Sequence, residues 1–70
     1  MDGNFFTPEK GKKYLNLNGL HYNCIGHDEE GRAWMQSDNK DKWTFVAVGC
    51  RQYKDGTMDW CHSLHGHFEK

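Results

Sequence analysis

The sequence predicts a small all-β domain: an antiparallel meander of about five strands, forming a twisted sheet or an SH3-like barrel. Three observations lead to this prediction. Clear turn signals divide the chain into short segments, several segments alternate apolar and polar residues, and no segment has a helical period. Aromatic residues make up 14% of the 70 residues, and their bulk can fill the thin core that so short a chain allows.

The elements follow from the N-terminus. Residues 1–11 are polar, contain the only proline, and are predicted to be a lead-in to a single β domain over residues 12–70. Asn18-Gly19 separates strands predicted at 14–17 and 20–25, and this pair is the preferred one for a two-residue type I′ hairpin turn.

The later elements are bounded by polar turns. A turn at 29–31 precedes a strand at 32–36, and a polar loop over 37–42 precedes the most β-prone stretch, 43–48. The last predicted strand, 57–62, follows a Lys-Asp-Gly turn.

Alternation assigns a face to each strand residue. The residues predicted to form the core are Leu20, Tyr22, Cys24, Ala33, Met35, Trp43, Phe45, Ala47, Met58 and Trp60. The opposite side carries His21, Trp34, Val46, Val48 and Cys61. Two interpretations of the apolar residues on this side stay open: they form an interface, or Phe5 and Phe6 fold over them.

A partner-binding surface is predicted from residue types that dominate binding hot spots. Its members are Arg32, Trp34, Val46, Val48, Arg51 and Tyr53. The alternative is that Arg51 and Tyr53 pack beside the neighbouring turn.

Composition argues against several function classes. The net charge of −1 lacks the basic excess of a nucleic-acid-binding protein, so no direct nucleic-acid contact is expected. No segment is long and apolar enough to cross a membrane, and residues 1–13 lack the pattern of a secretory signal. A cytoplasmic location with reduced thiols is therefore expected, and the odd number of cysteines agrees with it.

Thiols and imidazoles suggest a structural zinc site. The chain has three cysteines and five histidines, and zinc prefers four such ligands. The predicted ligands are Cys50, Cys61, His65 and His67, with Cys24 able to replace one histidine. The alternative is that Cys24 is a small core residue and the histidines are solvated, because no Cys-x-x-Cys pair is present.

The sequence favours a non-enzymatic protein. It has no nucleophile elbow, phosphate-binding loop or dinucleotide motif. Cys61 and His62 are adjacent, and neighbouring strand residues point to opposite faces. A thiol-dependent enzyme is kept as the less favoured alternative.

Two stretches resemble a known group of proteins. The first runs from Lys12 to Cys24, and the second from Gly31 through the Trp-Thr-Phe-Val-Ala-Val-Gly segment to Trp60. Together they are similar to short proteins of phages and mobile elements of Gram-positive bacteria, among which are anti-CRISPR proteins that block Cas9. The resemblance implies an inhibitor that binds Cas9, or Cas9 with its guide RNA, in the cytoplasm of the bacterial host.

The shared residues are turns and core aromatics, so the resemblance concerns the fold more than the function. The Cys61-His62 pair and the His65-Gly66-His67 segment depart from the pattern. A zinc-stabilised module of a phage or host regulator is therefore the alternative function.

Overall fold

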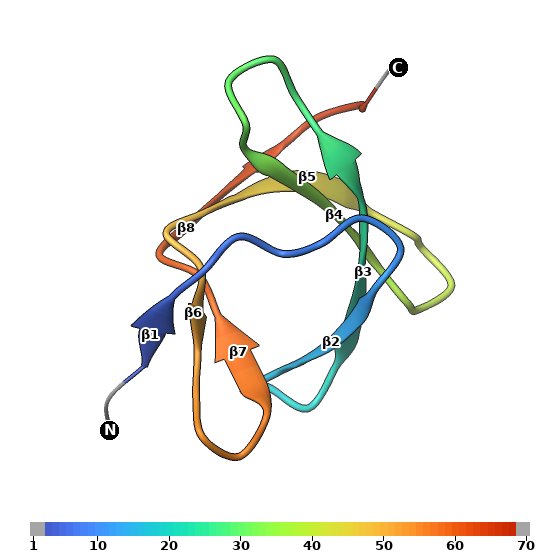
Figure 1. Cartoon of the computed structure of the whole chain (residues 1–70). Coiled ribbons are helices and arrows are strands. Elements are labelled where there is room, and N and C mark those ends of the chain that lie inside the picture. The colour runs from blue at the N-terminus through green and yellow to red at the C-terminus, as the bar shows by residue number, and fades with distance from the viewer. Residues whose placement is uncertain (1–2, 69–70) are drawn as a thin grey trace.

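The computed structural model describes residues 3–68, which form one mixed β-sheet without a helix (Figure 1). The strands are β1 (Asn4–Phe5), β2 (Lys13–Asn16), β3 (His21–His27), β4 (Ala33–Ser37), β5 (Thr44–Val48), β6 (Arg51–Gln52), β7 (Thr57–Asp59) and β8 (His62–His65). Their order in the sheet is β1-β6-β7-β2-β3-β4-β5-β8. No helix in this part of the chain could span a membrane.

The all-β prediction is confirmed, and the five-strand meander is only roughly matched. β2 to β5 pair antiparallel in succession, as a meander requires. However, β7 lies parallel to β2, and the short strands β1 and β6 pair with each other at one end of the sheet. The strand predicted at 57–62 divides into β7 and β8, and the sheet is not closed into a barrel.

The three short hairpin loops share one design. In the β2–β3 loop, the amide of Asn16 donates to the carbonyl of Leu20, and that of Gly19 donates to the carbonyl of Asn16. Gly19 has a φ of 89°, which favours glycine. The loop is thus a three-residue turn ending in a left-handed glycine, and the predicted two-residue turn is wrong. The same pattern recurs around Gly31 and Gly56.

One bent hairpin joins the two ends of the sheet. β5 pairs with β8 and β6 pairs with β7 in the same register: Val48 lies opposite His62, and Arg51 lies opposite Asp59. Between these pairs the chain bends at Gly49, whose φ is 72°. The bend places β7 beside β2, while β8 stays beside β5 as an outermost strand.

The core is small, aromatic and rich in sulfur. Its buried members are Tyr14, Tyr22, Cys24, Ala33, Met35, Phe45, Ala47, Cys50 and Met58, with Phe6 and Trp60 packed against them. Most of the predicted core is confirmed. Leu20 and Trp43 were assigned to it wrongly, because their side chains are 47% and 55% exposed.

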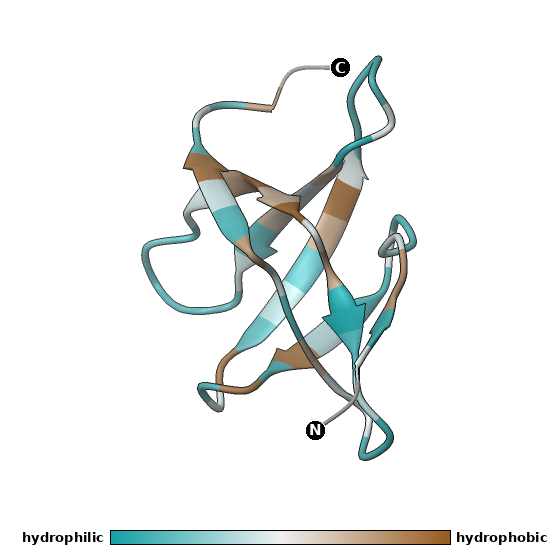
Figure 2. Cartoon of the chain, turned by 90° about the vertical axis from the view of Figure 1, so that its left-hand side faces the viewer, coloured by the Kyte–Doolittle hydropathy of each residue, from teal (hydrophilic) through white to brown (hydrophobic). Residues whose placement is uncertain are grey.

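The residues of the N-terminal lead-in contact the domain. β1 pairs with β6, Pro8 is buried, and the ring of Phe6 lies 5.6 Å from that of Tyr14. The hydroxyl of Tyr14 accepts a hydrogen bond from the amide of Glu9. In Figure 2 most loops are hydrophilic, whereas the strands carry both hydrophobic and hydrophilic residues.

Met58 provides a test of this core. Its side chain is fully buried, so M58A should lose roughly 2–5 kcal/mol of unfolding free energy. A domain of this size has only about 4–10 kcal/mol in total. Urea unfolding measures the difference, with L17A as the control because Leu17 is 49% exposed. Equal losses in the two variants would contradict the assigned core.

Candidate interaction surface

The loop between β4 and β5 holds its shape through two polar side chains. The carboxamide oxygen of Asn39 accepts hydrogen bonds from the amides of Asp41 and Lys42, at 3.1 and 3.2 Å, and from the hydroxyl of Ser37. The Ser37 hydroxyl in turn accepts from the amide of Trp43 at 3.0 Å. Lys42 has a φ of 51°, and these bonds fix its left-handed conformation.

This loop presents Trp43 at the surface. The backbone of Trp43 is bonded on both sides, since its carbonyl also accepts from the amide of Ser37 at 3.0 Å. Its indole ring is nevertheless 55% exposed. It meets the imidazole of His65 edge to face at 5.7 Å, and that imidazole lies 5.8 Å from the buried ring of Phe45. The exposed indole of Trp43 is therefore connected to the core residue Phe45 through the imidazole of His65.

Trp43 lines an open groove of about 660 Å³. We call this surface the Trp43 ledge, defined by Lys42, Trp43, His65 and His67. Gln36, Asp41, Thr44 and Gly66 complete the groove lining. The hydroxyl of Thr44 donates to the carbonyl of Gly66, which ties the end of β8 to the start of β5. An apolar ring with polar neighbours is the usual composition of a protein-binding surface.

The outer side of β4 and β5 is a second apolar cluster. Trp34 lies opposite Val46, and Val46 lies opposite Leu64 on β8. The C-terminal segment covers Trp34: the ring of Phe68 lies 5.5 Å from the indole, and Gly66 approaches it closely. Val46 is buried, whereas Leu64 is 53% exposed at the sheet edge.

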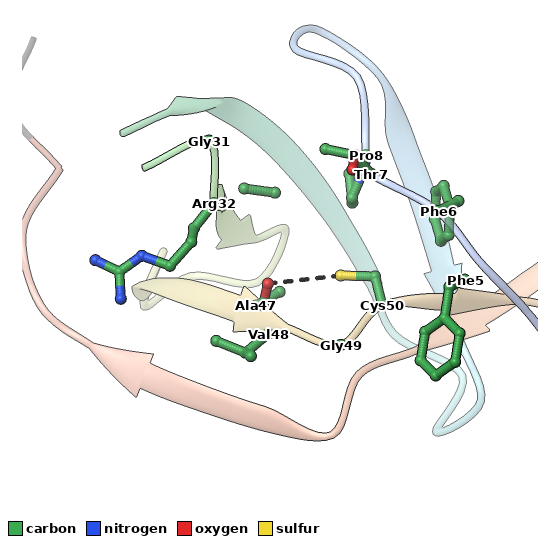
Figure 3. A pocket seen from close by; sticks show the side chains of 11 residues that line it. Phe5, Phe6, Thr7, Pro8, Gly31, Arg32, Ala47, Val48, Gly49 and Cys50 are labelled. Carbon is green, nitrogen blue, oxygen red and sulfur yellow. Dashed lines mark hydrogen bonds between the residues drawn. The ribbon is translucent and has the colours of Figure 1, made fainter. Parts of the chain in front are cut away.

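The N-terminal segment lies beside the other end of this face. Phe5 to Pro8 face Arg32, Val48 and Cys50 across a groove of about 350 Å³, which Figure 3 shows. Phe5 itself is 74% exposed. Of the predicted interface residues, Arg32 is paired with Asp28 at 2.9 Å and with Glu30 at 3.4 Å.

Arg51 and Tyr53 lie at the opposite end of the bent hairpin. Arg51 pairs with Asp59 at 3.5 Å, and the hydroxyl of Tyr53 donates to the same carboxylate at 3.1 Å. Tyr53 is buried, and its ring contacts Gly3. The structure thus separates these two residues from Trp34 and Val46.

The predicted zinc ligands divide between the core and the surface. Cys24 and Cys50 are buried, whereas Cys61, His65 and His67 are exposed. Within residues 3–68, no three His, Cys, Asp or Glu side chains are grouped to hold a metal ion. Zinc stays a prediction, which elemental analysis of protein purified without a metal-affinity tag checks.

Burial governs the chemistry of the two core thiols. It raises the pKa of Cys50 to about 11, and its Sγ lies 3.7 Å from the carbonyl oxygen of Ala47, a contact drawn in Figure 3. Burial also raises the pKa of Cys24. Both groups are therefore protonated at neutral pH, and a protonated thiol is a poor nucleophile and metal ligand.

The comparisons with known proteins provide no relative. No family model, curated protein or solved structure matches this chain. The functional argument therefore rests on the residues themselves.

Sequence reasoning missed the Trp43 ledge because it treated Trp43 as the first core residue of its strand. A signal was present: five polar residues precede Lys42 without an apolar residue that could cover the indole. His65 was singled out only as a metal ligand, although its imidazole contacts two aromatic rings.

Thiol labelling tests the placement of the cysteines. Cys61 is exposed and should react in a fast phase at pH 8, while Cys24 and Cys50 react only after unfolding. The physical reason is that both core thiols are buried and held protonated. Reaction with an aromatic disulfide reagent, followed by mass spectrometry, counts the modified sites. C61S should show no fast phase, and a fast phase in C61S would contradict the assignment.

Proposed function

We propose that this chain is a non-enzymatic binding module that recognises a partner protein with the Trp43 ledge. One observation carries the proposal: a tryptophan more than half exposed sits on a backbone that is hydrogen-bonded on both sides. Removing an exposed indole from water is favourable, and a partner protein that covers the indole gains this free energy.

The held loop makes such binding efficient. Association is opposed by the entropy lost when mobile side chains and loops become ordered. Trp43 is already restrained, because Ser37 is hydrogen-bonded to its backbone and His65 packs against its indole ring. Tryptophan is also among the residues most enriched at binding hot spots.

The mobile-element resemblance supports Cas9 as the first partner to test. An inhibitor of a bacterial defence protein needs a stable surface and no chemistry of its own. The net charge of −1 favours contact with the protein over contact with the guide RNA, because the chain offers no excess of cations to neutralise phosphates. The expected complex forms in the bacterial cytoplasm.

A pull-down with Cas9 and guide RNA, combined with a DNA-cleavage assay, tests the proposal. W43A should weaken binding about 30-fold or more, the equivalent of a hot spot worth about 2 kcal/mol. F5A is the matched control, because Phe5 is also an exposed aromatic residue and lies on the strand at the other end of the sheet. Thermal melts establish that both variants are folded.

The possible failures of this experiment differ. If the wild-type chain neither binds Cas9 nor slows cleavage, the Cas9 assignment is wrong. If it binds and W43A binds as well as F5A, the Trp43 ledge is not the binding surface.

A further inference from the structure

β8 is an outermost strand of the sheet, and all four of its residues are exposed. Proteins usually protect such an edge with lysine, proline, an inward-pointing charge or a bulge. β8 reads His-Ser-Leu-His and contains neither lysine, acidic residue nor proline. It therefore lacks these protective residues and has unused backbone hydrogen-bonding groups along one side.

The positions of those groups follow from the pairing with β5. The amide of Gly66 donates to the carbonyl of Thr44. Because hydrogen-bonding direction alternates along an antiparallel strand, His62 and Leu64 also bond toward β5. The backbone groups of Ser63 and His65 therefore point to the free edge.

The outer face of β8 continues an apolar row. Trp34, Val46 and Leu64 lie opposite one another on three adjacent strands. Val46, in the middle of the row, is only 2% exposed, whereas Leu64, at the end of the row on the edge strand, is 53% exposed. Whatever pairs with β8 would also cover Leu64.

We infer that β8 pairs with β8 of a second copy of this chain, antiparallel and with Leu64 on the two-fold axis. In this register Ser63 and His65 of one copy exchange backbone hydrogen bonds with His65 and Ser63 of the other. Leu64 then faces its own counterpart in a pair without hydrogen bonds, where side chains are closest. The apolar row thereby runs continuously through both sheets.

A second copy fits this edge because the pattern is self-complementary. Antiparallel self-pairing joins outward-facing groups only if the two-fold axis passes through a residue and not between two residues. An axis through Ser63 places Leu64 opposite His62, and one through His65 places it opposite Gly66. Only the axis through Leu64 brings the two exposed leucines together, and a shared two-fold interface is the commonest form of homodimer.

This inference does not depend on the proposed partner. The Trp43 ledge shares His65 with the proposed dimer edge, but the dimer pairing uses the backbone of His65 whereas the ledge uses its imidazole, which contacts Trp43. A dimer would carry two copies of the ledge. Its test therefore uses the purified chain alone.

Analytical ultracentrifugation over a concentration series measures the mass. The wild-type chain should sediment as a species of twice its 8.2 kDa mass. L64K should be monomeric, because it places charges face to face on the axis. S63P should also be monomeric, since its missing amide faces the free edge and not β5. L17K is the matched control and should stay dimeric.

Disulfide trapping tests the register. Facing residues in a pair without hydrogen bonds have Cα atoms about 4.5 Å apart, within the range of a disulfide. In a C61S background, L64C should oxidise rapidly to a covalent dimer, while L17C should not. A wild-type chain that is monomeric at all concentrations overturns the inference. So does a dimer that survives both L64K and S63P, or one that L64C does not trap.

Discussion

Trp60 makes the contact on which the rest of the structure depends. The residue lies between β7 and β8 in the chain, and the centre of its indole lies 5.0 Å from the ring centre of Tyr22 and 5.0 Å from that of Phe45. Tyr22 belongs to β3 and Phe45 to β5, so one side chain ties the bend to both parts of the sheet. Each such aromatic pair contributes about 0.5–1.5 kcal/mol beyond its buried area. In a domain with so small a core, these contacts are a large share of the stability.

The same contact connects the core to the proposed binding surface. From Trp60 the aromatic packing continues through Phe45 to His65 and ends at Trp43. Trp60 is half-buried and Phe45 is buried, whereas His65 and Trp43 are exposed. The indole of Trp43 is consequently supported by the interior, which distinguishes it from Phe5, whose ring is 74% exposed at the other end of the sheet.

The alternation of apolar and polar residues correctly predicted the features of the fold that depend on residues close together in the sequence. Alternation placed Met35 and Met58 in the core, and both are fully buried. It was wrong for Trp43 because this residue precedes β5, beyond the point where other strands cover the inner face. It was wrong for Leu20 because the turn has three residues and leaves Leu20 at its edge.

The remaining features depend on contacts between distant segments. β1 and β6 have two residues each, too few for an alternating pattern, and their pairing follows from the bend at Gly49. The packing of Phe68 over Trp34 joins residues of two distant segments that no turn or spacing relates.

The arrangement of the tryptophans is tested most directly by nuclear Overhauser effects in the folded chain. The indole of Trp60 should show cross-peaks to the rings of both Tyr22 and Phe45, and that of Trp43 should show them to His65. A soluble paramagnetic probe should broaden the Trp43 indole far more than the Trp60 indole. Cross-peaks from Trp60 to only one of its two partners, or equal broadening of the two indoles, would contradict the account.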